Sequence, residues 1–198
     1  MNRALLTIVA MLAITPAMAQ DTTDLVYSIE ASASVSPIVS MFQEPRYPGA
    51  TDELSYGYGG FVQVQWRPGR LVAFGIMTGW AFLAHDELPS NPTIDDEGPV
   101  TASATLTAIP LQVFVSMRSE HFKAGLGMGP YLMMSQLESD DVSKGSRFEL
   151  GLTFVSSYVF PISSTLKIGP ELRVLYLDYR GILSIMPSVV LTSTLYEY

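Results

Sequence analysis

The 198-residue sequence predicts an all-β fold, an eight-stranded antiparallel up-and-down transmembrane β-barrel, on three observations. The chain begins with a segment typical of exported proteins, and no later segment is apolar for long enough to form a transmembrane helix. The rest divides into eight segments in which large apolar residues alternate with small or polar residues. Hydrophobic residues make up 48% of the chain, and strands that contact lipid explain this content.

Residues 1–19 have the organisation of a cleavable signal peptide. Arg3 supplies a positive charge, residues 4–14 form an apolar stretch, and Ala17-Met18-Ala19 is a small-x-small cleavage site. The apolar stretch is well short of the ~20 residues with which an α-helix spans a bilayer. We therefore expect residues 1–19 to be removed on export and residues 20–198 to form one β-barrel domain.

Charge and cysteine content exclude several classes of function. The chain has no cysteine, so neither disulfides nor thiolate metal sites can stabilise it outside the cytoplasm. Its formal net charge is −8 and only 15% of its residues are charged. Nucleic acid is therefore not an expected partner, because no basic stripe is present to replace phosphate counterions.

The eight alternating segments have about the length of tilted membrane strands, roughly 9–11 residues. One face carries large apolar and aromatic residues, whereas the other is mostly Gly, Ala, Ser and Thr, which is too bare for a solvent-facing exterior. We expect the bare face to line a narrow lumen and the large face to contact lipid, with aromatic girdles near the strand ends. The expected strands are 25–35, 55–67, 71–83, 101–117, 122–135, 148–158, 166–177 and 185–198.

The charged residues in the middle of these strands share one face. An Arg or Lys that faces lipid near the bilayer centre costs about 2–4 kcal/mol, so such charges are expected inside the barrel. Glu30, Glu149, Glu171 and Arg173 all alternate in phase with the small residues of their strands. The sequence therefore predicts that these four side chains form a polar network in the lumen.

The lengths of the connections predict the orientation. The expected connections at 36–54, 84–100 and 136–147 are long and acidic, whereas those at 68–70, 118–121, 159–165 and 178–184 are short. Barrels of bacterial outer membranes have short periplasmic turns and longer external loops. We therefore expect both chain ends in the periplasm and the acidic connections outside the cell.

The segment AGLGMGPYLMM at 124–134 is unusual for a strand, because it contains three glycines and a proline. Its alternation places Gly125, Gly127 and Gly129 in the lumen, and we expect Tyr131 and the Glu171–Arg173 pair to fill the space above them. Proline cannot donate a ladder hydrogen bond. A bulge or a locally broken ladder is therefore expected at Pro130 and likewise at Pro110 and Pro170, and the exact strand register is left open at these three prolines and at Pro187.

Three stretches resemble the small bacterial outer-membrane β-barrel family, of the porin-family, OmpX-like and PorT-like type. They are IPLQVFVSMRSEHFKAGLGMGPYLMM at 109–134, IGPELRVLYLDY at 168–179 and the ending LTSTLYEY. The resemblance implies an eight-stranded barrel in the outer membrane, in contact with its lipids and lipopolysaccharide. It also implies that Tyr196 and Tyr198 belong to the C-terminal signal through which the barrel assembly machinery inserts such proteins.

One candidate catalytic group stands at the expected start of the second external loop. His85, Asp86 and Ser90 resemble the His, Asp and Ser that lipid A-modifying barrels of the palmitoyltransferase type carry near the external rim. These residues would supply a base, its orienting partner and a nucleophile. No second motif accompanies them, so a solvated acidic loop is the preferred interpretation, and neither a cofactor nor a metal is expected.

The sequence thus favours a non-enzymatic role in stabilising the envelope, in adhesion or in surface binding, with an external ligand that the sequence does not identify. Two alternatives stay open. One is a lipid A-modifying acyltransferase or deacylase that uses His85. The other is a soluble periplasmic ligand-binding barrel, which requires the two strand faces to be inverted.

Overall fold

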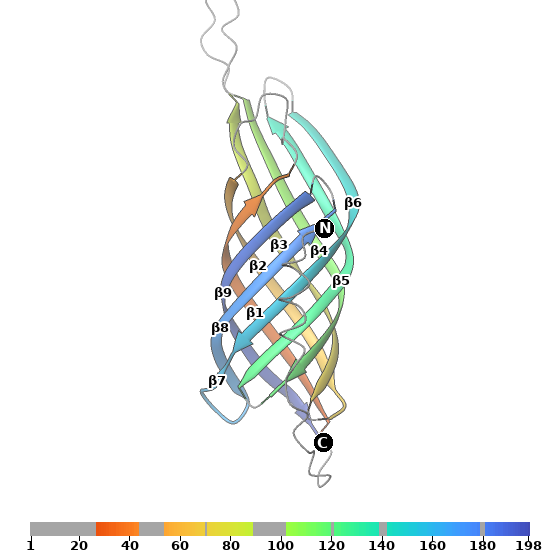
Figure 1. Cartoon of the computed structure of the whole chain (residues 1–198), viewed down its shortest axis with the longest axis vertical. Helices are drawn as coiled ribbons and strands as arrows, with labels where there is room; N and C mark the ends of the chain where they lie inside the picture. Colours follow the sequence, from red (N-terminus) through yellow and green to blue (C-terminus); the bar gives the residue numbers. More distant parts are fainter. Residues whose placement is uncertain are drawn as a thin grey trace, which may run out of the picture.

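The chain forms a closed antiparallel β-barrel whose strands run obliquely around its long axis (Figure 1). The computed structural model describes residues 27–43, 54–69, 71–88, 102–119, 121–138, 142–178 and 181–198. The predicted signal peptide therefore lies outside the described residues. The strands are β1 (Ser28–Met41), β2 (Leu54–Arg67), β3 (Val72–Leu88), β4 (Ala102–Arg118), β5 (Phe122–Glu138), β6 (Val142–Tyr158), β7 (Phe160–Pro161), β8 (Leu166–Leu177) and β9 (Ile182–Glu197).

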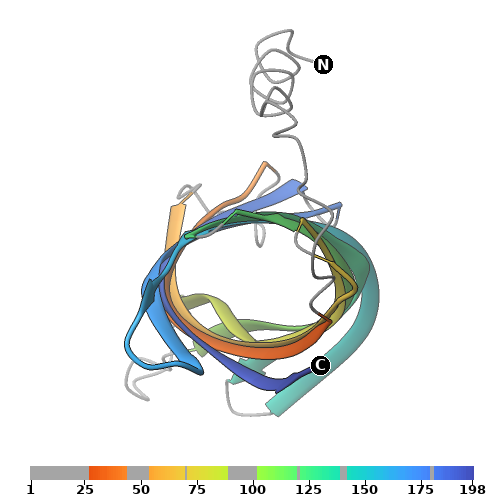
Figure 2. The same cartoon turned by 90° about the horizontal axis from the view of Figure 1, so that it is seen from below.

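Consecutive strands pair with each other except β6 with β7, and two further pairings close the ring, which Figure 2 shows in a view along the barrel. β1 pairs with β9, and β6 pairs with β8. β7 pairs with β8 in the same register as β6, so β6 and β7 together form one interrupted strand, and the barrel wall has eight strands. This confirms the predicted eight-stranded barrel. In the described ranges, no helix has the length and apolarity needed to cross a membrane.

Several strands are longer than predicted, always at the end where the long connections lie. The prediction of a long fifth connection at 136–147 is wrong, because β5 continues to Glu138 and β6 begins at Val142. The added residues pair in unbroken register, for example Gln136 with Lys144. Apart from Leu137 and Val142, the added residues are polar or glycine on both faces, so they lack the alternation that marks a strand in lipid. Hydrogen bonds between the two backbones extend β5 and β6 although this alternation is missing.

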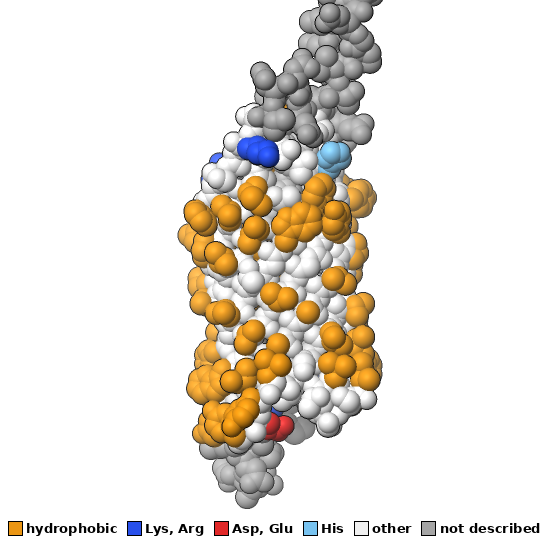
Figure 3. Space-filling view, turned by 180° about the vertical axis from the view of Figure 1, so that it is seen from behind, with side chains coloured by type: hydrophobic (Ala, Val, Ile, Leu, Met, Phe, Trp, Pro, Cys, Tyr) orange, Lys and Arg blue, Asp and Glu red, His pale blue; other side chains and the backbone are white. Residues whose placement is uncertain are grey.

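The two faces of the wall have the predicted composition. Side chains such as Ile76, Val113 and Met128 point outward and are 66%, 63% and 59% exposed. Apolar side chains of this kind are spread over the barrel wall in Figure 3. The alternate residues point inward and are buried, among them Gln63 and Arg173. A large apolar exterior around a partly polar interior is the arrangement of a barrel that contacts lipid.

Prolines interrupt the hydrogen-bonded ladders without changing their register. Pairing of β3 with β4 stops between Thr78–Leu111 and Ala81–Ala108, on either side of Pro110. Pairing of β4 with β5 likewise stops between Pro110–Tyr131 and Val113–Met128, across Pro130. Pairing of β8 with the sixth strand of the wall stops at Pro170, which is where that strand is divided into β6 and β7, whereas β8 pairs with β9 through Pro170. This confirms the expectation of a broken ladder, since a proline nitrogen has no hydrogen to donate. Register shifts occur elsewhere, between Ile29 and Glu30 and between Phe82 and Ala84.

The glycines of AGLGMGPYLMM make room for a residue that the sequence did not single out. A Cβ on Gly125 or Gly127 would lie 2.4 Å or 2.6 Å from ring atoms of Phe114. The expectation that Tyr131 and the Glu171–Arg173 pair fill this space is therefore wrong. Phe114 is the cross-strand neighbour of Gly127 and points inward, so its ring lies over the bare side of β5. Tyr131 lies instead against Gly151 on β6.

We expect Gly127→Ala to lower the free energy of unfolding by about 1–3 kcal/mol, because the added methyl group overpacks the lumen against Phe114. Urea titration of the protein folded in detergent micelles measures the loss. Phe114→Leu should relieve it in the double variant. Gly60→Ala is the matched control, because its Cβ would come no closer than 3.8 Å to its neighbours. Equal effects of the two alanine substitutions would contradict this packing.

Candidate functional site

The lumen divides into an apolar half and a polar half. The apolar half lies toward the long connections at 44–53 and 89–101, and its side chains form one buried cluster. It includes Ile38, Phe42, Leu83, Tyr131, Leu175, Leu177, Ile182 and Met186. Only a few polar groups interrupt it, such as the hydroxyls of Ser40 and Ser184, whose oxygens lie 2.8 Å apart. Close apolar packing of this kind excludes water from that half of the barrel.

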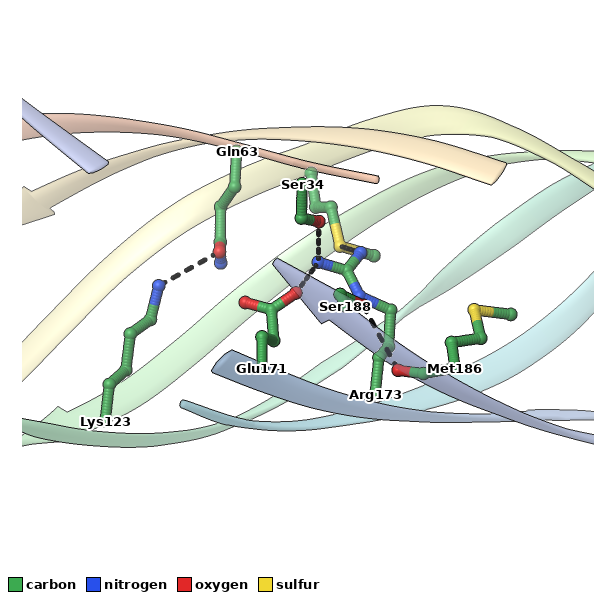
Figure 4. A network of polar contacts seen from close by, with 8 residues as sticks. Ser34, Gln63, Lys123, Glu171, Arg173, Met186 and Ser188 are labelled. Atoms are coloured by element: carbon green, nitrogen blue, oxygen red, sulfur yellow. Dashed lines mark hydrogen bonds and ion pairs between the residues drawn. The ribbon is translucent and has the colours of Figure 1, made fainter. Parts of the chain in front are cut away.

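The polar half lies toward the short turns and is built from side chains that reach across the lumen (Figure 4). Arg173 on β8 donates to Glu171 at 2.7 Å and, past β9, to Ser34 on β1 at 3.2 Å. Its other terminal nitrogen is 2.8 Å from the Met77 sulfur, and its guanidinium lies 4.1 Å from the centre of the Phe61 ring. Arg173 is 2% exposed, so these contacts replace its hydration.

The structure brings together only two of the four residues of the predicted lumen network. Glu171 and Arg173 are paired, whereas Glu30 accepts a short hydrogen bond from Arg118 and lies 3.8 Å from Arg67. Glu149 pairs with Arg147 at 3.0 Å, in a part of β6 where both side chains are partly exposed. Direct contacts therefore do not join all four side chains into a single network.

Sequence reasoning did not assign roles to two further pairs of residues in the polar half. Lys123 donates to the Gln63 side-chain oxygen at 3.1 Å, and its ammonium lies 5.9 Å from the centre of the Phe114 ring. Gln65 donates to the Ser116 hydroxyl at 2.9 Å. Lys123 and Gln63 alternate in phase with the small residues of their strands, and this phase was enough to place both side chains in the lumen. It does not reveal which residue on another strand each of them contacts.

The structure places His85 on a strand and not in a loop. β3 continues to Leu88, and His85 pairs with Thr105 on β4. After the register shift at Phe82, the His85 side chain is exposed, with its Nδ1 3.3 Å from the Thr105 hydroxyl and its ring 6.2 Å from that of Phe82. Asp86 follows on the same strand, and Ser90 lies outside the described residues. The described part of the chain holds no group of three or more metal-ligating residues.

Aromatic side chains gather near both ends of the wall. At the long-connection end, the Tyr58 ring stacks on Phe82 at 5.4 Å and meets Trp80 at 5.5 Å. At the other end, Tyr27 stacks on Tyr198 at 5.3 Å, and their backbones exchange two hydrogen bonds of 3.0 Å. The Tyr196 ring lies 5.2 Å from that of Tyr198. Aromatic girdles of this kind mark the two interfaces of a membrane.

A shallow depression of about 180 Å³ lies at the mouth beside the long connections. It is lined by residues of β4, β5 and β6: Leu106, Met133, Ser135, Gly145, Ser146 and Arg147. Its walls mix apolar and polar groups and include the cation of Arg147. Among the described residues, this depression adjoins no catalytic arrangement.

A scan against protein-family models finds no match, and a search of curated proteins finds none either. Among solved structures, the barrel is similar to neisserial surface protein A, with a TM-score of 0.54 and 11% identity over 84% of this chain and 97% of that chain. It is also similar to Ail, the attachment invasion locus protein of Yersinia pestis, with a TM-score of 0.50 and 12% identity over 84% and 99%. The chain therefore has the fold of the small outer-membrane β-barrels.

Proposed function

We propose that this protein is an integral β-barrel of a bacterial outer membrane with a non-enzymatic role in stabilising the envelope, in adhesion or in binding a surface ligand. One observation carries the proposal: outward apolar side chains form a belt between two aromatic girdles. Exposing such a belt to water is unfavourable for a monomeric barrel, whereas placing it in contact with lipid is favourable. A soluble ligand-binding barrel needs the opposite arrangement, with its apolar face inside.

The filled lumen supports a role other than transport. The apolar cluster around Tyr131 and Leu177 closes one half, and the contacts of Arg173 and Glu30 cross the other. An eight-stranded barrel has room for side chains and little more. We therefore place the function on the external surface, where the sequence carries its acidic connections, and not in the lumen.

The proposed partners follow from this location. Outer-membrane lipids contact the apolar belt, and the barrel assembly machinery inserts the chain through the C-terminal segment that ends in Tyr196 and Tyr198. The acidic connections would contact the divalent ions that bridge lipopolysaccharide, since Ca²⁺ and Mg²⁺ prefer carboxylate oxygens. We expect a ligand that serves adhesion or surface binding to contact the same acidic connections.

Lipid A mass spectrometry separates this proposal from the enzymatic alternative. Cells that express the protein and cells that lack it should give the same lipid A acylation pattern, because His85 contacts Thr105 and Phe82 on the outer wall. An added or removed acyl chain that depends on the protein and is abolished by His85→Ala would replace a surface role by acyl transfer. Asp86→Asn serves as the second variant in that case.

The orientation gives a test with two single-cysteine variants, which is possible because the chain contains no cysteine. We expect Ser143→Cys, on the exposed upper part of β6, to react with a polyethylene-glycol maleimide on intact cells. Ser164→Cys, in the exposed turn between β7 and β8, should react only after the outer membrane is opened. The reverse pattern would contradict the proposed orientation, and labelling is read as a shift in gel mobility.

A further inference from the structure

The polar half of the lumen contains more positive than negative charge. Its acidic groups are Glu30 and Glu171, and its basic groups are Arg67, Arg118, Lys123 and Arg173. One more charge of each sign, the half-buried Lys167 and the exposed Glu197, lies near this group at the turn end. Inside the lumen, two carboxylates thus face four cations. All of these side chains except Arg67 are largely removed from water; Arg118 is 7% exposed and Lys123 is 8% exposed. Burial of a charge without a counter-charge costs several kcal/mol even after relaxation, as an order of magnitude.

The surplus charge is concentrated at one place. Arg118 and Lys123 stand directly opposite each other on β4 and β5, and both point into the lumen. Cross-strand partners of like charge repel each other. Glu30 neutralises Arg118 through a short hydrogen bond, but none of the close ion pairs among the described residues includes Lys123. The Lys123 ammonium is held by the uncharged Gln63 side-chain oxygen, and the carboxylates of Glu171 and Glu30 act on it only from a greater distance.

Unused hydrogen-bond donors accompany this charge. The second terminal nitrogen of Arg118, the side-chain nitrogen of Gln63 and the Arg67 Nε are buried and have no hydrogen-bond partner, against one such acceptor in this group, the Glu30 Oε1. Gln63 is 3% exposed, and its oxygen holds the Lys123 ammonium at 3.1 Å, so its amide nitrogen lies beside that ammonium. Buried donors are normally satisfied, and donors without a partner indicate an acceptor. A water molecule would satisfy the donors but would leave the surplus charge.

We propose that this part of the lumen binds one small monovalent inorganic anion, of the size of chloride, between the side chains of Lys123, Arg118 and Gln63. The Phe114 ring lies 5.9 Å from the Lys123 nitrogen and limits the size of the ligand. The anion reaches the site from the turn end, where the Arg67 side chain is 19% exposed, because apolar packing closes the other half. This inference rests on the barrel fold and is independent of the surface role.

Thermal unfolding in detergent micelles tests the proposal, with sodium chloride or sodium bromide compared with sodium gluconate at equal ionic strength. Gluconate is too large for the site. At a halide concentration about tenfold above the dissociation constant, the unfolding midpoint should rise by about 3–6 °C. Lys123→Met should abolish this rise, whereas Lys144→Met, which removes an exposed lysine of β6, should retain it.

Anomalous scattering from crystals grown in bromide gives a direct measurement on the unmodified chain, which decides the matter even where Lys123→Met does not fold. A bromide peak within contact distance of the Lys123 ammonium and the Arg118 guanidinium supports the site. Absence of a peak there, with equal midpoints in halide and gluconate, overturns the proposal. A halide-dependent rise that persists unchanged in Lys123→Met overturns it as well.

Discussion

Arg173→Met should lower the free energy of unfolding by about 3–5 kcal/mol, because Glu171 then stays buried without its ion-pair partner. The substitution also removes the hydrogen bond to Ser34 and the contact of the guanidinium with the Phe61 ring. These contacts join β8 to β1 and β2 across the lumen, so their loss loosens the barrel as a whole. Urea titration of the protein folded in lipid vesicles, followed by tryptophan fluorescence, measures the change.

Two companion variants identify the cause of that loss. Combining Glu171→Gln with Arg173→Met should recover much of the stability, since removal of both partners leaves neither of them as an unpaired charge in the lumen. Arg147→Met is the surface control, because the Arg147 side chain is 46% exposed in its pair with Glu149, and its loss should cost about 1 kcal/mol or less. Equal costs for Arg173→Met and Arg147→Met would refute the account of the polar half.

Ile76→Arg should lower the free energy of unfolding in lipid vesicles by about 2–4 kcal/mol, because it places a charge on the lipid face near the bilayer centre. Ile76 is 66% exposed and stands between Val64 on β2 and Val113 on β4, in the middle of the apolar belt. In a water-soluble barrel the same substitution at an exposed position would be close to neutral.

Ser143→Arg is the matched control for Ile76→Arg. Ser143 is exposed on β6, beyond the apolar belt and close to the start of the strand. An arginine there remains in water, so we expect a change within about 0.5 kcal/mol. If Ile76→Arg is tolerated as well as Ser143→Arg, the outward face does not contact lipid.

The fold could be predicted from the sequence because a strand in a membrane barrel has one lipid face and one lumen face. Alternation of large and small residues therefore records both the strand and its orientation. β8 was predicted with its observed bounds, Leu166–Leu177, since its alternation runs from end to end. Beyond the apolar belt the pattern disappears, which is why the upper parts of β3, β5 and β6 were assigned to loops and His85 was placed in one.

The candidate site was less predictable, because contacts across a lumen depend on the tilt and register of all strands together. Glu30 and Arg118 lie 88 residues apart, and no local pattern connects them. Arg173 and Glu171 are adjacent on one strand face, so their pairing could be anticipated from the two-residue spacing. Phe114 was missed because its segment has the least regular alternation and contains Pro110. Its place in the alternation nevertheless indicated that the side chain points inward.

Outer-membrane fractionation with heat-dependent gel migration tests the central claim, that this chain is a barrel with a lipid-facing exterior. We expect the protein in the outer-membrane fraction, resistant to extraction by urea, and migrating faster on a denaturing gel when unheated than after boiling. The compact band should persist in wild type and Ser143→Arg and be weakened in Ile76→Arg. A freely soluble protein whose migration does not depend on heating would contradict the account.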